Sequence, residues 1–228
     1  MVQLSAGALM LAALCWIVGD ALIVGFDKPD KRKHAAFIAH MGDDMYAFYL
    51  HVNDRRLRAG ALVANFSAWL LLAGLYSQWQ LTSHSLTGRI GVVLLGIGFS
   101  LYPLAHAAFY PLALASERAY AAWQTGRDAA ATAQHARRLR AFLLTAWLPA
   151  AAFAFGGWLL IGIAVATGQT SFPPWAAAMT PLVQLVLWIF LPRVPYPGRP
   201  LLHGACLNIV VFVWASAFLF LAARYPVS

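Results

Sequence analysis

Five polar side chains interrupt stretches of this sequence that are otherwise apolar. Two of them, Asp20 and His106, carry groups that can exchange a proton. The other three are the amides Asn65, Gln184 and Asn208, which can donate hydrogen bonds to a polar group. An ionisable side chain in hydrocarbon costs roughly 2.5 to 3.5 kcal/mol on insertion scales, so it needs a partner or a function. We therefore predict acid/base chemistry, with Asp20 as the base or proton holder and His106 as its acid/base partner.

All five side chains are expected at one depth. Counted from the cytoplasmic end of each expected span, they lie about six to nine residues in, or about 9 to 14 Å at the helical rise per residue. If they face inward, they form a polar pocket that the apolar outer halves of the spans would close. We predict that Asn65, Gln184 and Asn208 contact a ligand in this pocket. The alternatives are interhelical hydrogen bonding by the amides and a purely structural pairing of Asp20 with His106.

A further candidate region is the stretch HAAFIAHMGDDMYAFYLHV, residues 34–52, which is too polar to cross a membrane. On a helix, His40 and Asp44 would share one face with Phe37 and Phe48. Basic residues on both sides place the stretch at the cytoplasmic surface, either in the interface or as a re-entrant lid over the polar layer. We therefore add His40 and Asp44 to the predicted ligand-binding residues. The alternative is a plain amphipathic interfacial helix whose His and Asp face water.

No motif identifies a metal or a cofactor. The sequence contains no HExxH and no CxxC, and His40 and Asp44 with His106 are too weak a pattern to predict a zinc site. Cys15 and Cys206 belong to different expected spans at different depths, so we expect no disulfide between them. The cofactor stays unidentified at this level.

The elements that must position these residues follow from composition. The chain has 228 residues, of which 61% are hydrophobic and 11% charged, and its mean hydropathy is +0.68. These values indicate an all-α polytopic membrane helix bundle forming one domain over residues 1–228. A spanning helix needs about 20 apolar residues. Six stretches meet this need, with the stretch at 34–52 as an additional interfacial or re-entrant helix, and they are residues 2–26, 59–78, 90–115, 141–168, 175–191 and 201–223.

The distribution of basic residues predicts the topology. Lys and Arg concentrate between the first and second, third and fourth, and fifth and sixth expected spans, whereas the other side receives only Arg89 and Arg224. The positive-inside rule then places both termini on the non-cytoplasmic side of the inner membrane. The formal charge of +8 comes without a nucleic-acid-binding motif. We therefore expect anionic membrane lipids, and no nucleic acid, as partners of the basic residues.

Prolines and glycines predict local features of the bundle. Pro111 cannot donate a backbone hydrogen bond and so frees a carbonyl three to four residues earlier, close to His106. Glycines within spans let helices approach closely. Those expected to do so are Gly91, Gly96, Gly98, Gly156 and Gly157.

Several short motifs resemble a known family. They are WIVGD (16–20), RLRAGAL (56–62), AHAAFYP (105–111), WAAAMTPL (175–182) and HGACLNIVVF (203–212). Together they are similar to a bacterial family of multi-pass membrane proteins classed as a domain of unknown function. The resemblance implies a six-helix membrane domain and no activity. The matching positions single out Asp20, Arg58, His106, Pro181 and Asn208.

These observations favour a protein that binds or processes a lipid-like or amphiphilic small molecule at the cytoplasmic leaflet of a bacterial inner membrane. A proton-coupled transporter of a small solute, and a structural or assembly subunit, are the alternatives. No nucleophile can be named, because Ser67, Ser100 and Thr180 are also typical partners of helix backbone carbonyls. The reaction class, and whether the chain forms a homo-oligomer, stay open.

Overall fold

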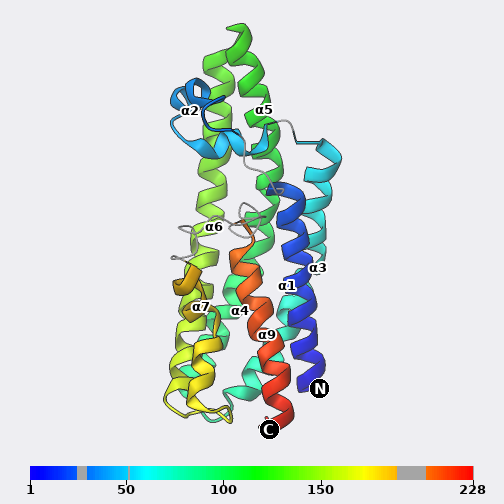
Figure 1. Ribbon diagram of the computed structural model, residues 1–228, viewed down its shortest axis with the longest axis vertical. Helices are drawn as coiled ribbons and strands as arrows, with labels where there is room; N and C mark the ends of the chain where they lie inside the picture. Colours follow the sequence, from blue (N-terminus) through cyan, green and yellow to red (C-terminus); the bar gives the residue numbers. More distant parts are fainter. Residues whose placement is uncertain (25–29, 51, 189–203, 228) are drawn as a thin grey trace.

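The computed structural model describes residues 1–24, 30–50, 52–188 and 204–227, and this part of the chain is helical, without strands. Figure 1 shows a long bundle in which both termini lie at one end and the turn between α5 and α6 lies at the other. In chain order the elements are α1 (Val2–Val24), α2 (Ala35–Met41), the 3₁₀ helix η1 (Asp44–Tyr49), α3 (Asp54–Leu81), α4 (Leu86–Ala107), α5 (Phe109–Thr125), α6 (Ala129–Ala166), the 3₁₀ helix η2 (Pro174–Met179), α7 (Pro181–Trp188) and α9 (Cys206–Arg224).

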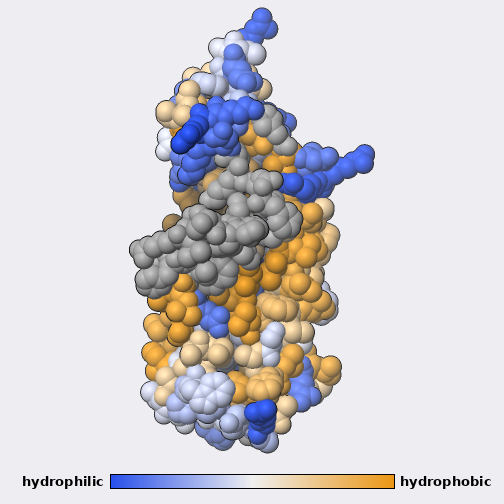
Figure 2. Space-filling model, viewed as in Figure 1, coloured by the Kyte–Doolittle hydropathy of each residue, from blue (hydrophilic) through white to orange (hydrophobic). Residues whose placement is uncertain are grey.

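The prediction of an all-α fold is confirmed, and five of the described helices are long and apolar enough to cross a membrane. They are α1, α3, the run Leu86–Thr125 formed by α4 and α5, α6, and α9. Figure 2 shows hydrophobic residues in a broad band over the middle of the molecule and hydrophilic residues gathered at the end opposite the termini.

The stretch expected as the fifth span, 175–191, differs from a continuous helix over its described residues. It contains η2 and α7, which meet at Thr180 in an extended conformation (φ −66°, ψ 147°). The physical reason is Pro181, because the ring of a proline disfavours the helical conformation for the residue before it. Parts of the expected spans, residues 25–26, 189–191 and 201–203, lie outside the described residues. A sixth spanning helix therefore stays a prediction.

Close helix contacts depend on particular glycines. A Cβ atom added to Gly157 of α6 would lie 2.6 Å from the carbonyl oxygen of Gly91 in α4, and one added to Gly60 of α3 would lie 2.8 Å from the carbonyl oxygen of Gly19 in α1. Gly156, the neighbour of Gly157, has its nearest such atom at 3.6 Å. The predicted close approach is therefore found at Gly91, Gly98 and Gly157, and α1 with α3 forms a second close pair that the sequence analysis missed.

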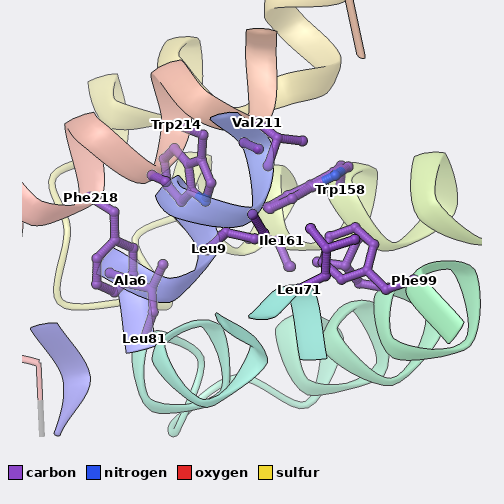
Figure 3. Packing of buried hydrophobic residues seen from close by; sticks show 14 of the residues in the cluster. Ala6, Leu9, Leu71, Leu81, Phe99, Trp158, Ile161, Val211, Trp214 and Phe218 are labelled. Atoms are coloured by element: carbon purple, nitrogen blue, oxygen red, sulfur yellow. The ribbon is translucent and has the colours of Figure 1, made fainter. Parts of the chain in front are cut away.

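The larger hydrophobic core fills the half of the bundle nearer the termini. Figure 3 shows its side chains converging from α1, α3, α4, α6 and α9. Leu9, Phe99, Ile161, Trp214 and Phe218 are each at most 1% exposed. This packing fixes the relative positions of the helices that also carry the polar residues.

A second hydrophobic cluster lies at the other end and contains most of the stretch 34–52. We call residues 35–49 the cap. The cap is two short elements, α2 and η1, because Gly42 adopts a left-handed conformation (φ 80°) and ends α2. Phe37 and Tyr46 of the cap are buried in this cluster with Leu112 of α5 and Leu143 of α6. The cap is thus packed against the α5–α6 hairpin as a folded unit, and its residues 35–49 do not form a single helical face.

Candidate functional site

A cavity of about 350 Å³ lies between α1, α4, α5, α6 and α9 and is bordered by η1 of the cap. Its size falls within the range of roughly 300 to 1,000 Å³ that is typical of small-molecule sites. Most of its lining is apolar or aromatic, and its polar groups include Asp20, His106 and Asn208. Ligand pockets commonly combine an apolar wall with a few convergent polar groups in this way.

The three polar residues come from three different helices. The Nδ2 atom of Asn208 in α9 donates a hydrogen bond of 2.7 Å to Oδ2 of Asp20 in α1. The other carboxylate oxygen of Asp20, Oδ1, lies 3.4 Å from Nε2 of His106 in α4. Asp20 and His106 are both buried, with 9% and 5% of their surfaces exposed. The arrangement holds an imidazole beside a carboxylate whose orientation a third residue fixes.

His106 has hydrogen-bonding capacity that the described residues leave unused. Neither Nδ1 nor Nε2 has a hydrogen-bond partner within the described part of the chain, although both atoms are buried. The ring lies instead among aromatic side chains, with the centroid of Trp16 at 4.9 Å and that of Phe109 at 5.9 Å. Buried polar atoms are rarely left unpaired in folded proteins, so an unpaired imidazole at a cavity calls for an explanation.

A break between two helices positions His106. α4 ends at Ala107 and α5 begins at Phe109. The break lies where Pro111 predicts it, because its ring nitrogen cannot donate to the carbonyl of Ala107 and its ring crowds that carbonyl. His106 thus occupies the last turn of α4, next to the cavity. Gly19 of α1 lies beside this turn, since a Cβ atom there would be in ordinary contact with Cε1 of the imidazole, at 3.4 Å.

Two of the five residues expected in the polar layer lie outside the cavity lining. Asn65 is half-buried in α3, and its Oδ1 atom has no hydrogen-bond partner among the described residues. Nε2 of Gln184 in α7 donates a hydrogen bond of 3.3 Å to the carbonyl oxygen of Met179, five residues earlier in the chain. The structure therefore brings together Asp20, His106 and Asn208 and leaves the other two amides apart. Depth can be counted along a sequence, whereas the direction in which a helix faces depends on packing.

The cap contributes a residue that the sequence analysis did not select. Met45 of η1 lines the cavity. His40 is exposed, and its carbonyl oxygen accepts a hydrogen bond of 2.8 Å from Nη2 of Arg137. Asp44 forms an ion pair with Lys31 at the surface. No spacing in the sequence singles out Met45, because Asp44–Tyr49 is a 3₁₀ helix, in which residues four apart do not share a face.

Contacts to α6 hold Met45 at the cavity. The carboxylate of Asp43 forms an ion pair with Arg140 and accepts a hydrogen bond of 2.8 Å from the backbone N–H of Met45. Tyr49 is also buried, and this burial, together with the nearby Asp20 carboxylate, raises the pKa of its phenol. η1 of the cap also contacts α1, the helix that carries Asp20.

The expectation that the outer halves of the spans are purely apolar is wrong. Nε1 of Trp214 donates to Oε1 of Gln78 at 3.0 Å, and Nε2 of Gln78 donates to Oγ of Ser77 at 3.1 Å. Ser5 accepts from the backbone N–H of Ser77 at 2.8 Å and donates to the carbonyl oxygen of Ala73 at 2.6 Å. Because these groups bond to one another, they link α1, α3 and α9 without unpaired atoms that would require a ligand.

Metal ligands do not gather at this site. Over residues 1–24, 30–50, 52–188 and 204–227, no group of three or more His, Cys, Asp or Glu side chains could hold a metal ion. Cys15 and Cys206 are both free thiols, and Cys206 lines the cavity. The chemistry that these side chains can supply is proton transfer by Asp20 and His106, with hydrogen-bond donation by Asn208.

Comparison with known proteins agrees with the resemblance in the sequence motifs. No curated protein and no solved structure matches the chain. One family model, described as Family of unknown function (DUF6796), matches residues 4–225, which is nearly the whole chain. The chain therefore belongs to this family of unknown function.

Proposed function

We propose that the protein binds or processes a lipid-like or amphiphilic small molecule in the cavity, using Asp20 and His106 for acid/base chemistry. The observation that carries the proposal is the placement of a carboxylate, an imidazole and an amide together at a largely apolar cavity. An amphiphile matches such a site, because its head can meet the polar group while its tail lies against the apolar wall.

Each residue has a defined part in this proposal. Asp20 holds or accepts a proton, and His106, which has an unused ring nitrogen on either side, passes a proton between Asp20 and the head of the ligand. Asn208 orients the carboxylate of Asp20 through its hydrogen bond. The proposal gives no role to the four other candidate residues, because they lie outside the cavity lining. These are Asn65, Gln184, His40 and Asp44.

We further propose a bacterial inner membrane as the location, with both termini on the non-cytoplasmic side. Both termini lie at one end of the bundle (Figure 1), and the cap lies near the other. Basic residues such as Lys31, Arg137 and Arg140 contact the cap or its flanks, and the positive-inside rule assigns such an end to the cytoplasm. The cavity would then belong to the cytoplasmic leaflet.

The packing around the cavity supports binding or catalysis over transport. A transporter needs a polar route that continues to the other side of the membrane. Toward the termini, the space between the helices holds the large hydrophobic core, including Trp214 and Phe218, and the hydrogen-bonded group around Gln78. That half of the bundle is thus filled with side chains that pack against one another or form hydrogen bonds with one another.

The test is a comparison of molecules that remain bound after purification in a mild detergent, measured by native mass spectrometry. We expect a bound mass of lipid size in the wild type and in His84→Gln, a control at an exposed histidine of the α3–α4 turn. Leu144→Trp, which places a larger side chain at the cavity wall, should lose that mass, and His106→Gln should retain less of it. A folded Leu144→Trp variant that keeps the full bound mass would contradict the proposal, as would a wild type that binds no amphiphile. The latter result would favour a structural or assembly subunit.

A further inference from the structure

The cavity has an unusual charge balance for a site at a buried carboxylate. Among its described lining residues, Asp20 is the one with a formal charge at pH 7, and neither Lys nor Arg is present. Among the described residues, Asp20 makes one ion-pair contact, in which its Oδ1 lies 3.4 Å from Nε2 of His106. A carboxylate away from water is costly unless an opposite charge accompanies it. The site therefore offers a place for a positive charge.

Asp20 also has capacity left for a ligand. An ionised carboxylate has about four lone-pair sites, and the described residues use one of them in the hydrogen bond from Asn208. The second oxygen faces His106 without a hydrogen bond of good geometry. A donor on a bound molecule can therefore reach a carboxylate that is already oriented.

Aromatic rings surround the same space. Trp16, Tyr102, Phe109 and Trp147 all line the cavity, and the centroids of Trp16 and Tyr102 lie 5.8 Å apart. The negative faces of such rings attract cations, and this attraction grows when the site excludes water. A carboxylate combined with several aromatic side chains is suited to an ammonium group.

We infer that the ligand is a cationic amphiphile, whose protonated amine head lies beside Asp20 and the aromatic rings. The inference rests on the proposed function and names the class of head that the cavity takes. A negatively charged head would place a like charge beside Asp20, which disfavours binding. A neutral hydroxyl would satisfy hydrogen bonds and leave the carboxylate without an opposite charge.

The basic residues near the cap do not cancel this preference. Arg140 is paired with Asp43, and Lys31 is paired with Asp44, so part of the positive charge is already compensated. Exposed charges are further screened over about 8 to 10 Å by salt. The head would instead meet Asp20 directly, and its tail would lie along Leu143, Leu144 and Leu207 of the lining.

The inference is tested with three probes of equal chain length, namely dodecylamine, dodecan-1-ol and dodecanoate. Dodecylamine is cationic at pH 7, as a lysine side chain is. Each probe is titrated at pH 7 into the protein in phosphatidylcholine nanodiscs, and binding is followed by native mass spectrometry. The variants are Asp20→Asn, which removes the charge at nearly constant shape, and Asp128→Asn, a control at an exposed aspartate before α6.

We expect the wild type and Asp128→Asn to bind dodecylamine about tenfold or more tightly than the alcohol or the carboxylate, since charged hydrogen bonds exceed neutral ones by about this much. Asp20→Asn should bring the affinity for the amine down to that for the alcohol. Equal affinities in the wild type, or a preference for the amine that survives in Asp20→Asn, would overturn the cationic head while leaving binding in the cavity intact. If no probe saturates, or if Leu144→Trp binds all three as the wild type does, the proposed function itself fails.

Discussion

Asn208 donates a hydrogen bond of 2.7 Å from Nδ2 to Oδ2 of Asp20, although 188 positions separate the two residues in the chain. The bond joins α9 to α1 and fixes the carboxylate with its other oxygen toward His106. The orientation of the candidate acid/base pair thus depends on contact between the first and last helices of the bundle.

Loss of this hydrogen bond should destabilise the fold. Asn208→Ala removes the donor and leaves one oxygen of the buried carboxylate unpaired, so we expect the free energy of unfolding to fall by about 1.5 to 3 kcal/mol. The measurement is equilibrium unfolding in mixed micelles. A double-mutant cycle with Asp20→Ala should give a combined cost smaller than the sum of the single costs. Additive costs would show that the two side chains do not stabilise each other.

Removal of the imidazole should leave the fold almost unchanged. His106→Phe keeps a ring against Trp16 and Phe109 and eliminates two buried nitrogens that lack hydrogen-bond partners among the described residues. Because the imidazole makes no hydrogen bond to a described residue, the substitution breaks none and removes two buried unsatisfied nitrogens, so we expect a change below about 1 kcal/mol. The same variant should lose binding of the ligand head. A loss of more than about 2 kcal/mol would contradict the view that the imidazole serves the site and not the fold.

Two adjacent glycines should respond in opposite directions to the same substitution. Gly157→Ala would place a Cβ atom 2.6 Å from the carbonyl oxygen of Gly91, and we expect it to lower the free energy of unfolding by about 1 to 3 kcal/mol through overpacking. Gly156→Ala meets its nearest atom at 3.6 Å and should be neutral or stabilise by up to about 1 kcal/mol through helix propensity. Equal effects of the two variants would argue against the close contact of α4 and α6.

The contact between Arg140 and Asp43 should control access to the cavity. Arg140→Ala removes the ion pair that holds the segment with Met45 against α6. We expect a membrane-permeant maleimide to modify Cys206, which lines the cavity, several-fold faster in this variant, because local opening becomes easier.

The labelling is done with Cys15 replaced by Ser, so that Cys206 is the one thiol that reacts. Arg138→Ala is the matched control, since the exposed Arg138 of the same helix makes no ion pair with a described residue. Equal modification rates in both arginine variants would mean that the cap does not restrict the cavity.

The sequence predicted the class of fold well because that prediction needs only length and polarity. Apolar stretches of sufficient length can cross a bilayer wherever their side chains point, and five described helices meet this criterion. The break beside His106 was predictable for an equally local reason, since Pro111 lacks the donor that the helix requires. The discontinuity at Thr180 was missed, although Pro181 carried the same type of signal.

The sequence by itself determined that the chain forms long apolar helices and that Asp20, His106 and Asn208 lie at similar positions along them, because such positions follow from counting residues along a helix. Only the tertiary structure decided that these three meet at one cavity while Asn65 and Gln184 do not. It also decided that Met45, and neither His40 nor Asp44, reaches that cavity. The physical reason is that the direction a helix faces is set by long-range packing, here at the contacts of Gly19 with Gly60 and of Gly91 with Gly157.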